Sequence, residues 1–280
     1  MKIDTFSKQI LFSTVRVIAQ DGESVGTAFL VSKQVTPESQ QIFLVTNKHV
    51  IAKADESGKI TGSFSKGQIS FIKQKDGEPI LGDSFAVNFD PNFTETFLQH
   101  PDETVDLAIC NISNIYNKIT QELEQSIYIK AIPIALIPTA DTSFDAIEDV
   151  LFVGYPNGIR DEKNHIPLIR RGMTATPFEI DYNGQKKFLI DAQVFPGSSG
   201  SPLFIRENNL KGGNLTLGEK YHFVGVISKV FFRNEKGQII EAVAPTNTAT
   251  TALTKQMIGL GLCEKSSQIN EMIEMVTKQK

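Results

Sequence analysis

The segment FPGSSGSPLF, residues 195–204, sets small residues and prolines between two hydrophobic ends. Such residues often form tight surface turns, so a plain turn is one interpretation. The other is a nucleophile loop, in which Ser199 attacks a substrate while the glycines let the backbone bend around a developing negative charge. A serine nucleophile needs a base to take its proton and a third group to orient that base. The rest of the chain must therefore supply both groups.

Four histidines are available as the base. His49 ends the run IFLVTNKH, where an apolar strand would hold the ring rigidly and still let it face a cleft. His100 and His165 lie in polar stretches and are expected to be exposed loop residues, whereas His222 begins the apolar run HFVGVI. Each histidine taken singly is more typical of a structural or solvated side chain than of a catalytic one.

Asp106 is the candidate orienting group. It precedes the apolar run LAI, and alternation along a strand would place its carboxylate partly inside the protein. A buried carboxylate is costly unless it is paired or hydrogen-bonded, so a specific partner is expected. A turn residue at the start of a strand is the alternative that this position alone leaves open.

The order His49, Asp106, Ser199, in the settings TNKHV, DLAI and PGSSGSP, resembles that of the trypsin-fold serine proteases. Within that family the chain is most similar to the bacterial HtrA/Deg branch. Each matching segment is short, but together they follow the family's order along most of the chain. They are GTAFLVS (26–32), LVTNKHV (44–50), VDLAI (105–109), FVGYPNG (152–158), DAQVFPGSSGSPLF (191–204), VGVIS (224–228) and AVAPTN (242–247).

The resemblance implies a serine endopeptidase that works through an acyl-enzyme intermediate. Ser199 would attack the peptide carbonyl, His49 would move the proton, and Asp106 would hold the imidazole in the useful tautomer. The backbone N–H groups of Gly197 and Ser199 would form the oxyanion hole. Ser228 matches a position whose hydroxyl contacts the aspartate. The substrate-binding residues that the resemblance implies are Gln193, Val194, Ser228, Lys229 and Val230.

Two departures from the family pattern are visible. Ser198 stands where digestive members hold an aspartate that pairs with a newly cut N-terminal amine, so activation by such a cleavage is not expected. The stretch after Asn247 is too short for the PDZ domain that usually follows the protease in HtrA proteins. Two alternatives to a constitutive protease therefore stay open. One is a non-enzymatic binding module with a protease fold, and the other is a protease that is inactive until a partner gates it.

Two sets of short strands, each bounded by turn residues, support an all-β fold. The resemblance implies two six-stranded antiparallel β-barrels with the active site in the cleft between them. The expected domains are residues 1–112 with His49 and Asp106, a connector at 113–130 with a short helix, and 131–246 with Ser199. The expected strands are 13–19, 27–32, 42–46, 69–73, 85–89 and 107–112, then 150–154, 168–176, 187–191, 202–205, 221–229 and 239–244.

Residues 247–280 are expected to form a C-terminal helical segment. The run TNTATTALTKQMIGLGL, from Thr246, has helix formers and two glycines near its end. The run SSQINEMIEMVTKQK, from Ser266, spaces its apolar residues as an amphipathic helix does. Its apolar stripe is expected to pack on the body of the protein.

Composition excludes several classes of function. The 280 residues are 40% hydrophobic and 21% charged, with a formal net charge of −4 and no block of like charges. Nothing indicates binding to nucleic acid or a membrane, and no run suits a signal peptide or a membrane span, so a cytoplasmic location is expected. Cys110 and Cys263 make no disulfide framework, and no metal-ligand spacing occurs. The triad chemistry needs no cofactor, so the expected partner is a protein or peptide substrate; the oligomeric state is left open.

Overall fold

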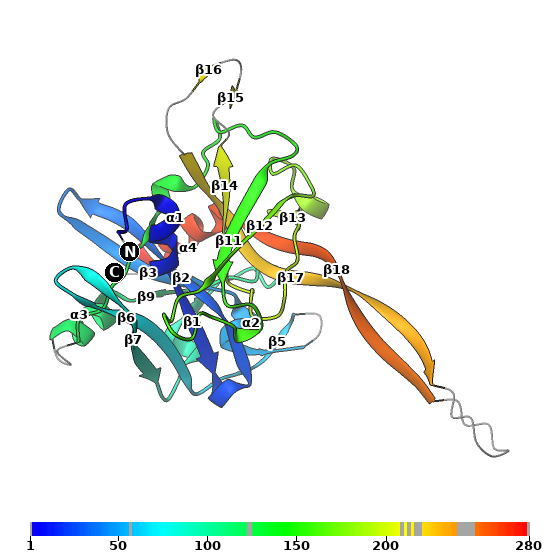
Figure 1. Ribbon diagram of the computed structural model, residues 1–280, viewed down its shortest axis with the longest axis horizontal. Helices are drawn as coiled ribbons and strands as arrows, with labels where there is room; N and C mark the ends of the chain where they lie inside the picture. Colours follow the sequence, from blue (N-terminus) through cyan, green and yellow to red (C-terminus); the bar gives the residue numbers. More distant parts are fainter. Residues whose placement is uncertain are drawn as a thin grey trace.

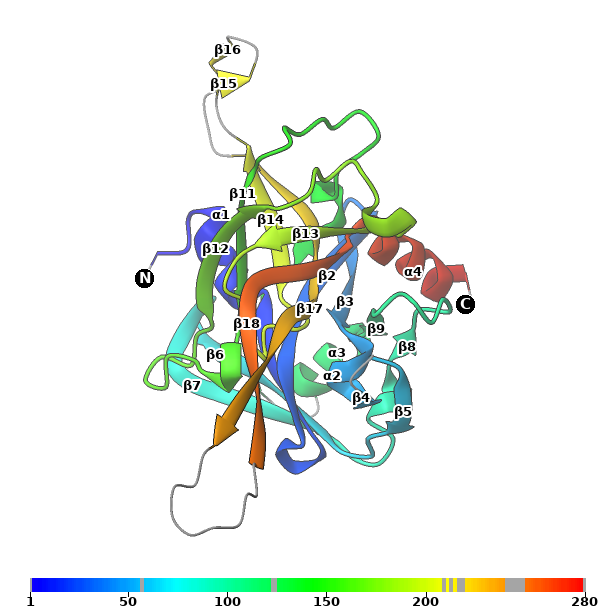
Figure 2. The same cartoon turned by 90° about the vertical axis from the view of Figure 1, so that its right-hand side faces the viewer.

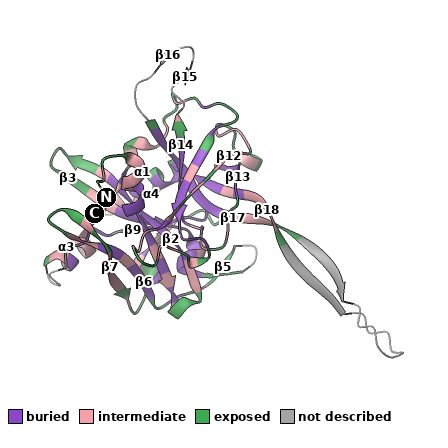
Figure 3. Ribbon diagram, viewed as in Figure 1, coloured by how far each residue is buried: buried purple, intermediate pink, exposed green. Residues whose placement is uncertain are grey.

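The computed structural model describes residues 2–55, 58–121, 125–207, 210–211, 214–215, 220–239 and 250–278. Within these residues the chain is built mainly from antiparallel strands in two successive halves (Figure 1). The two halves pack together, because one core cluster contains Phe29 and Phe43 from the first half and Phe204 and Phe223 from the second. Buried residues run through the centre of both halves (Figure 3).

The N-terminal half is one sheet with the strand order β7-β6-β1-β2-β3-β9-β8. Alternation produces its inner face: Val15, Val17 and Ala19 on β1 are buried in the core, as period-two patterning requires. The strands are β1 (Thr14–Ala19), β2 (Ser24–Thr36), β3 (Ser39–Thr46), β6 (Gly67–Lys75), β7 (Glu78–Phe89), β8 (Leu98–Gln99) and β9 (Ala108–Asn111), with β10 (Ile132–Pro133) parallel to β2 and a separate pair, β4 (Ala52–Ala54) and β5 (Ile60–Ser63).

All six strands predicted for this half are present, but their pairing does not close them into the predicted barrel. Within the described residues β7 and β8 stand at the two ends of the sheet. The sequence pattern missed β8 and β10 because each has only two residues, too few to show alternation.

The C-terminal half is a closed six-stranded barrel with the order β11-β12-β13-β18-β17-β14, as predicted for this half. Its strands are β11 (Asp149–Gly154), β12 (Leu168–Thr174), β13 (Lys187–Asp191), β14 (Pro202–Glu207), β17 (Lys220–Ile239) and β18 (Thr250–Lys265). A small separate pair joins β15 (Leu210–Lys211) to β16 (Asn214–Leu215). Beyond the barrel, β17 and β18 continue as a two-stranded ribbon (Figure 1).

The helix predicted from Thr246 onward is wrong where the structure describes it, because residues 250–265 form strand β18. Local helix propensity yields here to the partners that β13 and β17 offer on both sides. Gly261 fits because a Cβ there would lie 2.8 Å from Val194, and Gly259 takes a φ of +81°. Residues 240–249, which include most of the predicted strand 239–244 and the AVAPTN segment, lie outside the described residues.

Two longer helices complete the fold. Helix α3 (Ser113–Gln121) is the short helix predicted for the connector, and α4 (Ser267–Lys278) is the predicted amphipathic helix. The apolar stripe of α4 packs on the body, with Ile269, Met272 and Ile273 fully buried beside β9 (Figure 2). Shorter helices are α1 (Phe6–Gln9) and α2 (Lys48–Ile51), with 3-10 turns at Ile10–Phe12, Gln20–Gly22, Thr94–Thr96, Ile134–Leu136, Pro156–Gly158 and Tyr182–Gly184. The domain boundaries drawn from the sequence stay a prediction.

Candidate functional site

Ser199 lies in the turn that leads into β14, between Gly197 and Gly200. The backbone conformation at both positions is one that favours glycine. Gly197 and Gly200 have φ angles of +85° and +84°, in the left-handed region. A Cβ on Gly197 would lie 2.5 Å from the carbonyl oxygen of Tyr155, and one on Gly200 would lie 1.9 Å from that of Thr27. The small residues of the segment are therefore required by close packing of the loop, as well as by its curvature.

Two backbone N–H groups of this loop have no partner among the described residues. They belong to Gly197 and Ser199, whereas the neighbouring N–H groups are engaged: Ser198 donates to the carbonyl of Phe195, and Gly200 to that of Ile227. A pair of N–H groups in one turn, both uncommitted, is the arrangement that can bind a negatively charged oxygen.

Thr27, on β2, holds the loop of Ser199 from the other half of the molecule. Its N–H donates to the carbonyl of Ser199 over 3.0 Å, and its Oγ1 donates to the carbonyl of Gly197 over 2.9 Å. The same Oγ1 accepts the N–H of Tyr155 at 3.1 Å. Thr27 stands in the matching segment GTAFLVS, but no role for it could be predicted, because a threonine within a strand carries no signal of its partners.

His49 and Asp106 meet on the N-terminal half. His49 lies on α2, directly after β3, and Asp106 lies just before β9, the neighbour of β3. His49 Nδ1 lies 2.6 Å from Asp106 Oδ2, and the backbone N–H of His49 donates to Asp106 Oδ1 over 3.3 Å. The carboxylate thus holds His49 at two points, the ring nitrogen Nδ1 and the backbone N–H, which suits an orienting group.

Ser228, on β17, lies between these residues and Ser199. Its Oγ donates to Asp106 Oδ2 over 2.8 Å, and its carbonyl accepts the hydroxyl of Ser199 at 3.3 Å. Within the described residues Ser199 and His49 make no hydrogen bond with each other. The structure therefore brings the three candidate residues to one place, with the Ser199 hydroxyl bound to Ser228.

Asp106 is buried, with 7% of the residue exposed, and the pKa of its carboxylate is lowered from the usual value. Burial alone would raise the pKa of Asp106. The charge of His49, together with hydrogen bonds from His49 and Ser228, outweighs burial and favours the ionised form. Asp106 is thereby suited to balance a positive charge on the imidazole.

A cleft of about 610 Å³ opens over His49 and Ser199. Of the predicted substrate-binding residues, Ser228, Lys229 and Val230 line it, together with Phe195, Pro196 and Phe232. Gln193 and Val194 do not. Val194 is 3% exposed and packs inside the C-terminal barrel, while Gln193 is exposed and its carbonyl accepts Arg170 Nη2 at 2.8 Å. Buried and exposed residues alternate beyond the end of β13 at Asp191, which turns Val194 inward, away from the cleft.

Two other expectations about the site region can be compared with the structure. His100 was expected to be exposed but is buried, with Nδ1 accepting the N–H of Asp102 at 3.2 Å. The polar residues next to His100 in the sequence led to the wrong prediction that its side chain is exposed. Ser198 is 1% exposed, and its Oγ has no hydrogen-bond partner in the described part of the chain. Its side chain faces the interior and carries no charge that could form an ion pair.

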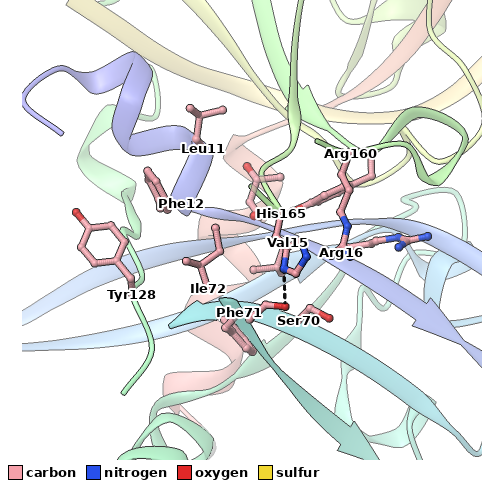
Figure 4. Close-up of a pocket in the computed structure, with 13 residues that line it drawn as sticks. Leu11, Phe12, Val15, Arg16, Ser70, Phe71, Ile72, Tyr128, Arg160 and His165 are labelled. Carbon is pink, nitrogen blue, oxygen red and sulfur yellow. Dashed lines mark hydrogen bonds between the residues drawn. The ribbon is translucent and has the colours of Figure 1, made fainter. Parts of the chain in front are cut away.

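A second cavity, of about 20 Å³, lies away from these residues (Figure 4). It is lined by Arg16, Arg160 and His165, and His165 Nδ1 lies 3.0 Å from Ser84 Oγ. Space of this size holds about one water molecule and no peptide. Among the described residues, no group of three or more His, Cys, Asp and Glu side chains is placed to hold a metal ion, and no helix has the length and apolar character to cross a bilayer.

Comparison with known families adds an independent observation. Residues 26–212 match the model of the trypsin-like peptidase domain. The chain belongs to this family. The matched region includes His49 and Ser199, which line the cleft, and Asp106, which is hydrogen-bonded to His49. No match is found among curated proteins.

Several solved structures align with nearly the whole chain of this trypsin-like peptidase family member. One is an inactive serine-to-alanine form of Rv3671c from M. tuberculosis, at 14% identity, covering 97% of this chain and 89% of that one, with a TM-score of 0.44. Another is the thermostable serine protease AL20 from an extremophilic microorganism, at 13% identity, covering 95% of this chain and 95% of that one, with a TM-score of 0.45. A third is the scabies mite inactivated protease paralogue S-I1, at 16% identity, covering 97% of this chain and 98% of that one, with a TM-score of 0.45.

Proposed function

We propose that the protein is a serine endopeptidase that hydrolyses peptide bonds through His49, Asp106 and Ser199. The observation that carries the proposal is the chain of hydrogen bonds from His49 through Asp106 and Ser228 to Ser199, which ends in one open cleft. A triad is recognised by such geometry and by the roles its groups can take. Membership of the trypsin-like peptidase family supports the same reaction class.

In the proposed reaction, the hydroxyl of Ser199 leaves the carbonyl of Ser228 and turns to His49 Nε2. Its oxygen attacks the substrate carbonyl carbon while His49 takes the proton, and Asp106 stabilises the imidazolium. The N–H groups of Gly197 and Ser199 bind the resulting oxyanion. His49 then gives the proton to the leaving amine, and water hydrolyses the acyl-enzyme by the same steps with His49 again as base.

The substrate backbone would bind as a strand beside β17. Strand β14 pairs with β17 only as far as Val226, and Ser228 to Val230 follow at the wall of the cleft. An extended peptide can add to such a sheet edge through main-chain hydrogen bonds. The substrate is accordingly a protein or peptide segment in extended conformation. The similarity to the HtrA/Deg branch, on the segments given above, belongs to the same proposal.

Intact-mass analysis after incubation with a fluorophosphonate probe tests the proposal. Native protein is expected to gain one adduct that Ser199→Ala and His49→Ala do not gain. Ser198→Ala is the matched control, because Ser198 is adjacent, buried and without a hydrogen-bond partner among the described residues; it should label as native protein does. An adduct that persists in Ser199→Ala would show that another serine is the nucleophile.

A partner-gated protease is the second candidate, favoured by one observation. The Ser199 hydroxyl donates to Ser228 and makes no bond to His49 within the described residues. A gated enzyme would hold this rotamer until a partner or substrate reshapes the loop. Native protein that gains an adduct only when a long peptide is present would support gating. Rapid labelling of the protein alone would exclude it.

A further inference from the structure

Next to Asp106 lies a second carboxylate that the proposed reaction does not use. Glu264, on β18, is 0% exposed. Its Oε1 accepts the backbone N–H of Asp106 at 3.2 Å. Full burial of a carboxylate costs much free energy and is rare unless the group is paired, so its partners indicate what it does.

Lys187, on the neighbouring strand β13, is the charged partner. Its side chain is 7% exposed, and its Nζ lies 3.3 Å from Glu264 Oε1. The same Nζ donates to the carbonyl of Thr104 over 2.6 Å. The buried pair therefore binds the chain at Thr104 and again at Asp106, two residues further on.

Helix α4 supports the pair from the other direction. Gln268, in the first turn of α4 and 2% exposed, donates from Nε2 to Glu264 Oε2 over 3.1 Å. Apolar residues of α4 share a core cluster with Val105 and Leu107, the two neighbours of Asp106. The C-terminal segment of the chain thus packs against the side chains on both sides of Asp106 and binds its backbone.

We propose that Glu264, held by Lys187 and Gln268, is a positioning residue that fixes the backbone of Asp106 and so the direction of its carboxylate. This inference rests on the proposed function, in which Asp106 orients His49. The backbone of Asp106 is gripped on both sides, because its carbonyl accepts Asn47 Nδ2 at 2.6 Å while its N–H goes to Glu264. Asn47 directly follows the strand that leads to His49, so the two grips fix Asp106 relative to the imidazole.

Loss of the hydrogen bond from the Asp106 N–H to Glu264 would reduce the catalytic rate by moving the Asp106 carboxylate away from its productive position. Catalytic groups work only within about 0.5 Å of their productive position, and a misplacement of 1 Å can cost about 10²-fold in rate. Without Oε1 the buried N–H of Asp106 would lack an acceptor, and the segment would shift to find one. Burial also raises the pKa of Glu264 against the attraction of Lys187, so the carboxylate depends on its surroundings to stay ionised.

Three double variants separate positioning from mere packing. Lys187→Met/Glu264→Met replaces the buried ion pair by flexible apolar side chains, a change that folded proteins often tolerate, and removes the acceptor. Lys187→Met/Glu264→Gln removes the same charges but keeps an acceptor oxygen for the Asp106 N–H. Asp181→Asn/Lys265→Met is the control. It neutralises the ion pair between Lys265, next to Glu264 on β18, and Asp181, whose charged atoms lie 2.6 Å apart and make no contact with Asp106.

The readouts are the fluorophosphonate labelling rate, the separate kcat and KM for a peptide, the unfolding temperature, and the NMR signal of the His49 Nδ1 proton. That proton lies in a short hydrogen bond to Asp106, so its signal is shifted downfield and reports the bond directly. We expect the Met/Met variant to lose about 10²-fold in labelling rate and kcat, with KM unchanged, and to lose the proton signal. The Gln variant should keep the signal and stay within a few-fold of native protein, as should the control.

Equal labelling of the Met/Met variant and native protein would overturn the proposal, and so would a Gln variant that fails as badly as Met/Met while remaining folded. If native protein does not label at all, the proposed function fails, but the proton signal still decides. Its loss in Met/Met and survival in the Gln variant would uphold the positioning role, and an unchanged signal in all three variants would reject it.

Discussion

Ser199 donates through Oγ to the main-chain carbonyl of Ser228, 3.3 Å away, while the side chain of Ser228 donates to Asp106. Ser228 therefore contacts the candidate nucleophile through its backbone and the candidate orienting group through its hydroxyl. The two contacts can be separated by mutation, because replacement of the side chain leaves the backbone carbonyl in place.

Ser228→Ala is expected to slow fluorophosphonate labelling about tenfold. A hydrogen bond to a charged group is worth about 1.5–3 kcal/mol, and Asp106 keeps its contacts with His49 as partial compensation. Labelling rates measured against native protein at one pH test this. An unchanged rate would show that the Ser228 hydroxyl does not contribute to the position or charge of Asp106.

Asp106 should make the folded state sensitive to acid. Because its folded pKa lies below the unfolded value of about 3.9, the ionised carboxylate stabilises the fold at higher pH, and this contribution is lost as pH falls through about 4 toward the lower folded pKa. Urea unfolding of native protein and Asp106→Asn at pH 7, 5, 4 and 3 measures the effect. The difference in free energy of unfolding between them should be constant above pH 5 and shift against native protein below pH 4. Parallel pH curves for the two proteins would contradict the lowered pKa.

Gly200→Ala should destabilise the protein by at least about 2 kcal/mol, since a Cβ there would meet the Thr27 carbonyl at 1.9 Å and Thr46 Oγ1 at 2.7 Å. Gly184→Ala is the matched control. Its φ of +72° imposes the same kind of backbone strain, yet nothing lies within 4 Å, so about 1 kcal/mol is expected. Urea unfolding of both variants gives the comparison. Equal losses would mean that the loop of Ser199 can move away from Thr27.

The sequence predicted the candidate site better than it predicted the framework around it. His49, Asp106 and Ser199 stand in short segments whose order resembles that of the trypsin-fold serine proteases, and the structure brings these residues together, while their catalytic roles stay a proposal. Strand β18 could not be predicted, since its partners β13 and β17 are distant in sequence and override a locally helical composition. Closure of the sheet depends in the same way on which edges meet, so only one of two predicted barrels is found closed.

The supporting side chains show a different limit. Lys187 and Glu264 are opposite each other on adjacent strands, and that register exists only once the barrel is built. The available signal was a lysine and a glutamate beside apolar residues. Their charge alone does not tell from the sequence whether they form a buried pair or are solvated. Val194 lies outside the cleft for a related reason: it follows the end of β13, where buried and exposed residues alternate, and its side chain packs inside the barrel.

Thr27→Val is expected to disturb the loop of Ser199 without enlarging or shrinking the core. Thr27 is 0% exposed, and valine has nearly its shape but can neither donate to the Gly197 carbonyl nor accept the Tyr155 N–H. Loss of these bonds should cost about 1–3 kcal/mol in the free energy of unfolding. Gly197 would lose its anchor, and its N–H, the proposed oxyanion donor, would lose its fixed direction, so the labelling rate should fall about tenfold or more. Thr27→Ser, which keeps the hydroxyl, should label at a nearly native rate despite the missing methyl group. A valine variant that is less stable but labels normally would show that Thr27 supports the fold and not the direction of Gly197.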